Sequence, residues 1–525
     1  MAIFKCKMCG GVLTPAGKEK IITCAYCGTK KNPYEVEKKT DAVEKDYFET
    51  TVFTCPQCGG EILGNHNEAA TFCTYCGSST ILSERISKEE CPDYIIPFKK
   101  TKEDCKEAYR KAMKKAIFVP KEYKSEEFID GFRGIYMPYW NYEFKLDGKV
   151  HLTAKEDIHQ EEYTLRNIFH VKGELDDTFQ GDAYDASLNF YDDISMGLAP
   201  FDFHSHKPFT PSFLSGFYAE CADVSKEVYL GEAMELAQEA TMHKITTSEE
   251  LKSFKLVGLA EGEVPFQTTL VKTAKTLYPV WFMSYRNGDK VAYAAVNGQT
   301  GKVAADMPVD KKKYVGYSML LAIPLFLILN LLFTFSPMQI TTLCAVCLLV
   351  TLVLYASELH EIYLKEQFIS DKAQMYKNQR YLEYESAFDG NPVFEFLKDS
   401  LYKVLEIVAA SISVILSVLV YLIPFLPILN WLLWGILIAG TLACTIYALG
   451  QIEKLDYKAS FHTSMFNIVV MFGVLVTVLI RPEAEIWYYG ASVLMLILVV
   501  LNFNEILNNY NYLAMRKMPQ FRKKG

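Results

Sequence analysis

The sequence predicts a multi-domain protein: two tandem zinc ribbons with four cysteine ligands each, a cytoplasmic α+β domain with an antiparallel sheet, and an all-α region of six transmembrane helices. Two observations carry this prediction. Eight of the fourteen cysteines form two copies of one metal-binding pattern near the N-terminus. Six long apolar runs follow residue 313, whereas the chain before them reads as soluble protein. The sequence between these regions shows the alternation and turn signals of strands and hairpins.

The cysteine pattern consists of two C-x-x-C pairs separated by fourteen residues, and its second copy begins 49 residues after the first. A glycine follows every pair, which suits the left-handed backbone of a metal-binding knuckle. Four thiolates complete a closed tetrahedral zinc site. The candidate ligands are Cys6, Cys9, Cys24 and Cys27 in ribbon 1 (residues 1–28), and Cys55, Cys58, Cys73 and Cys76 in ribbon 2 (residues 53–78).

Two other uses of these cysteines are less compatible with the sequence. Structural disulfides require an oxidising compartment, and the N-terminal MAIFKCKMCG lacks the apolar segment of a signal peptide. A C-x-x-C redox motif is expected singly, beside a βαβ pattern. We therefore expect two structural Zn2+ ions per chain, with a charged linker between the ribbons at residues 29–52.

Residues 93–305 are long enough to bury their own hydrophobic core, and they predict the α+β domain. A helix is expected near 101–117, with Thr101 as its N-cap and Asp104 in the capping-box position. A second helix is expected near 226–246.

Strand patterns surround these two helices. The segments GIYMPYWNYEF (134–144) and KVHLTAKED (149–157) alternate as two strands. Asn287-Gly288-Asp289 then predicts a tight hairpin after TLYPVWFMSYR, and Gly298–Gly301 predicts a second turn. We expect an antiparallel meander at the end of the domain.

The C-terminal part predicts membrane spans, because each apolar run approaches the roughly 20 residues that a bilayer core requires. Spans 1 and 2 lie within 314–356, a cytoplasmic loop covers 357–403, spans 3 to 6 lie within 404–503, and a basic tail covers 504–525. The six runs are 314–335, 338–356, 404–423, 427–449, 463–480 and 486–503.

The distribution of lysine and arginine predicts how these spans are oriented. The segments before span 1, after spans 2 and 4, and after span 6 carry sixteen of them, whereas the opposite loops carry Arg481. Because basic loops stay in the cytoplasm, both termini are expected there, with the chain in the inner (plasma) membrane. The zinc thiolates require the same reducing side.

The sequence contains no catalytic constellation, so we expect a protein that is not an enzyme. Residues 297–302 (NGQTGK) resemble a phosphate loop, but the glycines are three apart and a strand is predicted to follow. His204 and His206 would share one face of a strand, where surface or packing roles are expected. The second ribbon is acidic, which disfavours nucleic acid as a partner.

The tandem ribbons, Tyr94-Ile-Ile-Pro-Phe98, Gly134-Ile-Tyr-Met-Pro-Tyr-Trp140 and the VNGQTGKV hairpin resemble bacterial TFIIB-type zinc-ribbon-containing membrane proteins over roughly residues 1–310. Some relatives of that family are encoded beside phage-shock A-like and SPFH or virion-core-like proteins. The resemblance implies an adaptor that holds such assemblies at the inner face of the membrane. The six spans exceed the few that this family leads us to expect.

Taken together, these features predict a non-enzymatic membrane adaptor whose zinc ribbons recruit protein partners. The alternatives are a transporter or channel with a regulatory zinc-binding head, and a membrane-tethered nucleic-acid binder. The sequence leaves homo-oligomer formation open.

Overall fold

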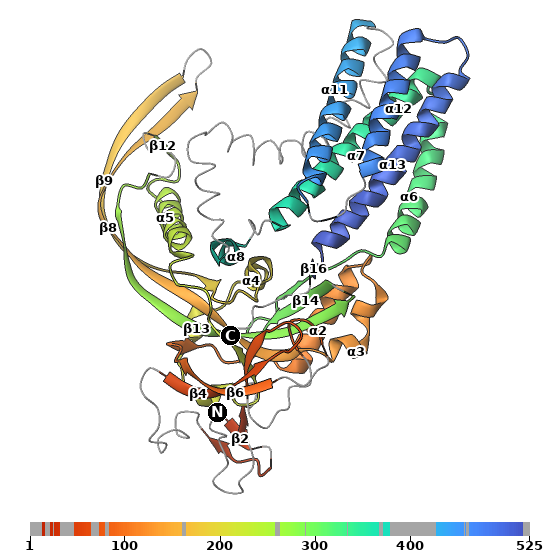
Figure 1. The fold of residues 1–525 in the computed structure, drawn as a ribbon. Helices are drawn as coiled ribbons and strands as arrows, with labels where there is room; N and C mark the ends of the chain where they lie inside the picture. Colours follow the sequence, from red (N-terminus) through yellow and green to blue (C-terminus); the bar gives the residue numbers. More distant parts are fainter. Residues whose placement is uncertain are drawn as a thin grey trace. The chain divides into compact units, whose positions relative to one another are not determined.

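The computed structural model describes residues 13–15, 22–24, 26–31, 47–64, 73–78, 83–159, 164–257, 263–288, 290–332, 334–366, 371–377, 427–455, 457 and 461–517. The chain divides into two compact units. Unit 1 comprises residues 1–114, 125–305 and 517–525, and unit 2 comprises 115–124 and 306–516. Figure 1 shows the elements of both, coloured along the chain.

Unit 1 contains a small sheet that belongs to the first ribbon. It consists of β1 (Leu13–Pro15), β2 (Ile22–Cys24) and β3 (Lys30–Lys31), paired antiparallel in that order. These three strands pair with one another and with no strand of the large sheet, among the described residues. The described strands of the first ribbon therefore form a separate small sheet.

The second ribbon is built into the large sheet of unit 1. It uses β4 (Tyr47–Thr54), β5 (Glu61–Gly64) and β6 (Ser83–Glu90). β5 pairs with β11 (Tyr218–Glu220), and β11 runs parallel to β8 (Arg133–His159). β4 begins inside the range predicted as linker (29–52), and β6 lies beyond residue 78, the predicted end of ribbon 2.

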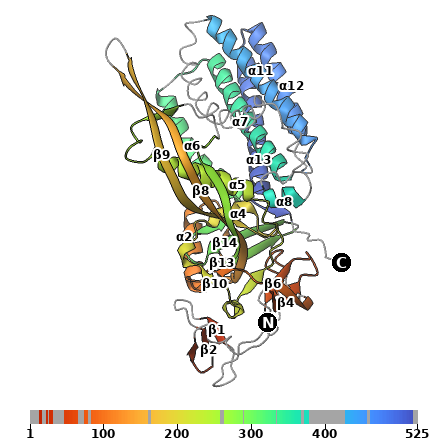
Figure 2. The same cartoon turned by 90° about the vertical axis from the view of Figure 1, so that its left-hand side faces the viewer.

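The large sheet confirms the predicted α+β domain with mostly antiparallel pairing. β8 pairs on one side with β9 (Thr164–Asp185) and on the other with β13 (Gln267–Asn287). Figures 1 and 2 show β8 and β9 as one long curved hairpin, with α5 (Leu230–Thr246) beside it. β8 is one strand of 27 residues, whereas the sequence predicts two shorter strands in this region.

Several local predictions are confirmed. α2 (Lys102–Lys115) starts with a reciprocal capping box: the Thr101 amide donates to Asp104, and the Asp104 amide donates to the Thr101 hydroxyl. β13 and β14 (Lys290–Asn297) form the predicted hairpin, in which Gly288 has a φ of 66°. β14 then pairs with β15 (Val303–Ala305) across the second predicted turn.

Short elements complete unit 1: β7 (Tyr94–Ile95), α3 (Glu126–Ile129), α4 (Asp192–Leu198), β10 (Lys207–Pro208) and β12 (Lys255–Val257), with 3-10 turns at Phe203–Ser205 and Pro211–Leu214. β7 pairs with β13 and with β10, and thus extends the sheet. The core combines the faces of β8, β13 and β14 with ribbon 2.

Unit 2 contains the helices α6 (Lys311–Leu332), α7 (Pro337–Glu366), α8 (Lys372–Lys377), α11 (Pro427–Ile452), α12 (Phe461–Ile480) and α13 (Ile486–Leu513), and a 3-10 turn at Lys121–Lys124. Four of them have a segment long and apolar enough to cross a membrane: α7, residues 433–452 of α11, α12 and α13. The run predicted at 404–423 lies outside the described residues. α7 continues ten residues into the predicted loop 357–403, and α13 continues ten residues into the predicted tail.

The α7, α11, α12 and α13 helices pack against one another around a common apolar core, which contains Leu348, Leu437, Met471 and Met495. Asn467 on α12 and Asn502 on α13 are both buried and exchange two side-chain hydrogen bonds of 3.2 and 3.0 Å. The outward faces of the four helices are apolar, as at Phe472 on α12 and Val500 on α13, which are each 67% exposed. Such faces suit lipid rather than water.

Candidate metal centre

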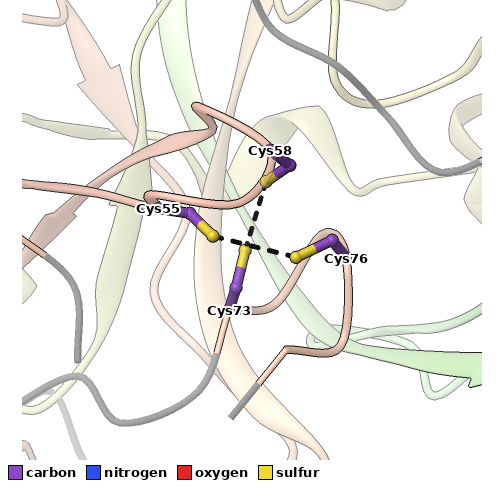
Figure 3. Close-up of side chains that lie close together, drawn as sticks. All are labelled: Cys55, Cys58, Cys73 and Cys76. Atoms are coloured by element: carbon purple, nitrogen blue, oxygen red, sulfur yellow. Dashed lines mark hydrogen bonds between the residues drawn. The ribbon is translucent and has the colours of Figure 1, made fainter. Parts of the chain in front are cut away.

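Four cysteines of ribbon 2 converge in unit 1, as the sequence predicts for Cys55, Cys58, Cys73 and Cys76. Their sulfur atoms all lie within 4.8 Å of one another. The Cys55 and Cys76 sulfurs are 3.8 Å apart, and those of Cys58 and Cys73 are 3.6 Å apart. Figure 3 shows the four side chains pointing toward one centre from two separate turns.

Both turns are knuckles with the same backbone hydrogen bonds. The Gly59 amide donates to the Cys55 carbonyl at 2.7 Å, and the Gly77 amide donates to the Cys73 carbonyl at 3.0 Å. Gly59 has a φ of 75° and Gly77 a φ of 66°. A side chain at either position would strain this backbone, which explains why glycine follows each C-x-x-C pair.

The geometry fits a tetrahedral metal ion. Bonds of about 2.3 Å to four thiolates place neighbouring sulfurs about 3.8 Å apart, close to the two observed distances. All four cysteines are at most 2% exposed. A cluster that supplies four ligands and excludes water leaves no open position for a substrate, which is typical of a structural site.

The four thiols of the cluster differ in pKa, because hydrogen bonds among their sulfurs stabilise the thiolates of Cys55 and Cys76, whereas the pKa values of Cys58 and Cys73 are raised. A hydrogen bond from Cys73 lowers the pKa of Cys55 to about 6. A hydrogen bond from Cys58 lowers the pKa of Cys76 to about 2, whereas hydrogen bonding to Cys55 raises the pKa of Cys73. A metal ion that binds all four sulfurs would displace the protons that remain on Cys58 and Cys73.

The centre lies against the core of the large sheet. Tyr75, inside the second knuckle, is 1% exposed, and its ring centroid lies 6.4 Å from that of Phe282 on β13. Gln57, inside the first knuckle, accepts a 2.8 Å hydrogen bond from Arg286. The metal centre and the sheet therefore share one hydrophobic core.

The described half of the first ribbon repeats the knuckle. The Gly28 amide donates to the Cys24 carbonyl at 3.0 Å, and Gly28 has a φ of 69°. Cys24 is buried and Cys27 is exposed. The other two predicted ligands, Cys6 and Cys9, lie outside the described residues.

Both ribbons carry a tyrosine in the second knuckle, and the environment of this tyrosine differs between them. Both knuckles read Cys-x-Tyr-Cys-Gly. Tyr75 is buried in the core, whereas Tyr26, its counterpart in ribbon 1, is 88% exposed. The repeated tyrosine is visible in the sequence, but its environment is not.

The prediction that His204 and His206 share one face of a strand is wrong. His204 lies in the 3-10 turn Phe203–Ser205, and His206 follows it. The His206 Nε2 atom lies 3.3 Å from the Tyr278 hydroxyl, and burial lowers the pKa of His206 to about 4. His206 is therefore uncharged at neutral pH.

Comparisons with known proteins give one informative relative. The chain is 31% identical over 333 residues to the "Uncharacterized protein YdjG" of Bacillus subtilis (strain 168). The alignment covers 62% of this chain and 96% of that protein. No protein-family model and no solved structure matches the chain.

Proposed function

The chain belongs to the same family as the uncharacterized protein YdjG of Bacillus subtilis, and we propose a function for it from its own residues. In this proposal the protein is a non-enzymatic membrane adaptor, and its first zinc ribbon docks a protein partner at the cytoplasmic face of the membrane.

The contrast between Tyr26 and Tyr75 carries this proposal. In ribbon 2 the tyrosine of the Cys-x-Tyr-Cys-Gly knuckle packs against another part of the protein: the Tyr75 ring is buried beside Phe282 in the sheet core. Tyr26 presents the same ring to solvent. Exposed aromatic side chains on a rigid support are frequent anchors of protein interfaces.

The metal chemistry supports a binding role over a catalytic one. Each ribbon would hold one structural Zn2+, through Cys6, Cys9, Cys24 and Cys27 in ribbon 1 and Cys55, Cys58, Cys73 and Cys76 in ribbon 2. A zinc with four thiolate ligands stiffens a fold and has no free position to activate water. Metal analysis of the purified chain should find about two zinc ions; one ion, or iron, would contradict this assignment.

We propose that the adaptor spans the membrane six times, with both termini in the cytoplasm. The outward apolar faces of α7, α11, α12 and α13 support the membrane location. α6 is also apolar and exposed, as at Leu321, which is 75% exposed. Reporter fusions at the C-terminus and after Pro482 should report opposite sides; the same side for both would refute the topology.

The partner is expected to be a cytosolic protein, and the resemblance described above suggests phage-shock A-like or SPFH-type assemblies. The test compares the membrane proteomes of cells that express four forms of the chain. These are the wild type, a deletion of residues 1–31, Tyr26→Ala and Tyr47→Ala. The deletion ends before β4, so the strands that ribbon 2 shares with the large sheet stay intact.

A partner docked by ribbon 1 should leave the membrane fraction in the deletion and in Tyr26→Ala cells. It should remain in Tyr47→Ala cells, because Tyr47 is a half-exposed tyrosine on β4 outside the knuckles. If no cytosolic protein follows this pattern, the adaptor proposal is wrong. Salt-sensitive binding of DNA or RNA that requires residues 1–31 would instead indicate a nucleic-acid binder.

A further inference from the structure

Two β-bulges meet at one level of the central strand β8. On one side, the pairing of β8 with β9 shifts between Asn141 and Glu143. On the other side, the pairing with β13 shifts between Leu270 and Lys272, opposite the same part of β8. Bulges re-aim side chains and are frequent beside binding sites. Here both neighbours of one strand are bulged together.

A cavity of about 230 Å³ lies beside these bulges in unit 1. Its polar lining comes from Tyr94, Asn141, Glu143, Gln180, His206 and Lys272. This volume exceeds the roughly 150 Å³ that admits a benzene molecule and lies below the roughly 300 Å³ of drug-sized pockets. It suits a molecule of about ten non-hydrogen atoms.

One wall of the cavity is a fixed hydrogen-bond chain. The Asn141 amide nitrogen donates to the Tyr278 hydroxyl at 2.8 Å, and that hydroxyl lies 3.3 Å from the His206 ring nitrogen. The Tyr94 ring stacks on His206, with centroids 5.6 Å apart. The Asn141 carbonyl oxygen is buried and has no hydrogen-bond partner among the described residues. A buried acceptor of this kind costs free energy until a donor reaches it.

The cavity also carries one charge of each sign. Lys272 lies over the Tyr94 ring and donates a 3.0 Å hydrogen bond to its hydroxyl. Glu143 lines the same cavity. Neither side chain forms an ion pair within 4.0 Å with any described residue. His206 adds no further charge at neutral pH, because it is uncharged.

We propose that this cavity binds a free amino acid as its zwitterion. The ligand carboxylate pairs with Lys272, and the ligand ammonium donates to Glu143 and to the unpartnered Asn141 oxygen. The aromatic rings of Tyr94 and His206 cover its apolar part. The size of the cavity, its single pair of opposite charges and its unused acceptor all match this chemistry. The site is independent of the proposed docking by ribbon 1.

The test uses the full chain in detergent micelles, with each proteinogenic amino acid added at millimolar concentration. At least one should raise the melting temperature, and titration calorimetry then gives its Kd. Lys272→Gln and Glu143→Gln should each weaken binding about tenfold or more, since each removes a charged hydrogen-bond partner. Lys149→Gln and Glu174→Gln are matched controls on exposed parts of β8 and β9, and they should bind as the wild type does.

Two further measurements identify the binding mode. The amide of the same amino acid lacks the carboxylate, so it should bind wild type and Lys272→Gln equally weakly. Ala274→Phe adds a ring at a residue that lines the cavity and should abolish binding. The proposal is overturned if no amino acid raises the melting temperature of the wild type. It is also overturned if Lys272→Gln and Glu143→Gln bind as tightly as their controls.

Discussion

The two ribbons contain the same knuckle in opposite surroundings. Cys24–Gly28 and Cys73–Gly77 share their sequence pattern, their glycine conformation and their backbone hydrogen bonds. The tyrosine of ribbon 2 is 1% exposed, and that of ribbon 1 is 88% exposed. The cysteine motif therefore fixes the local backbone, whereas the neighbouring strands decide whether the knuckle supports a domain or remains available to a partner.

The largest expected difference concerns the metal ligands themselves. Cys73→Ser should release one zinc and unfold the large sheet, because ribbon 2 and the sheet share one core. Structural zinc sites contribute about 10 kcal/mol or more to folding, which is comparable to the whole stability of a domain of about 5–15 kcal/mol. Cys24→Ser should release the other zinc and leave the melting temperature of the sheet unchanged. Metal analysis and thermal unfolding of the two variants check this prediction. If both variants unfold the sheet equally, the claim that only ribbon 2 shares its core with the sheet is wrong.

A smaller difference is expected at the knuckle tyrosines. Tyr75→Ala removes a buried ring from the core and should destabilise the sheet by about 3–5 kcal/mol, as for other aromatic truncations. Tyr26→Ala removes an exposed ring and should change stability by less than about 0.5 kcal/mol. Hydrogen exchange at the β13 amides around Phe282 measures the stability change in both variants. A large loss of protection in Tyr26→Ala would show that ribbon 1 also packs on the sheet.

The smallest difference is expected at the glycines. A side chain at φ near +66° to +69° strains both knuckles by about 1–2 kcal/mol. At Gly77 a new Cβ would also lie 3.2 Å from the Arg286 Cβ, whereas at Gly28 no atom of another described residue, apart from the two chain neighbours, would lie within 4 Å. Gly77→Ala should therefore lower the melting temperature of the sheet, and Gly28→Ala should affect only zinc retention by ribbon 1. Equal shifts in the two variants would contradict the shared core.

Local chemistry was predictable from the sequence. The Cys55–Cys76 cluster, the Thr101 capping box and the Gly288 hairpin each depend on residues close together in the chain. The fusion of ribbon 2 with the sheet was not predictable, because β5 pairs with β11 more than 150 residues later. The tyrosine environments follow from the same long-range pairing.

The structure has one continuous strand, β8, where the sequence predicts two. The two predicted strands leave a break at residues 145–148, but Gly148 adopts a φ of 143° and stays paired with Leu175. Glycine permits this conformation inside a strand. The cavity beside β8 was equally hidden, since a bulge depends on how three strands align and not on one segment.

The order of synthesis determines when a metal ion could first bind the buried cysteine cluster of ribbon 2. All four ligands of ribbon 2 lie within 22 consecutive residues, so they emerge from the ribosome together. Phe282, which covers Tyr75, follows the last ligand by 206 residues. At about 5–20 residues per second, synthesis of that interval takes roughly 10–40 s. During this period the thiols have no sheet to cover them, and a metal ion bound by all four would shield them from oxidation. We therefore expect metal loading to precede burial, so that a shortage of metal during translation harms this domain more than chelation after it has folded.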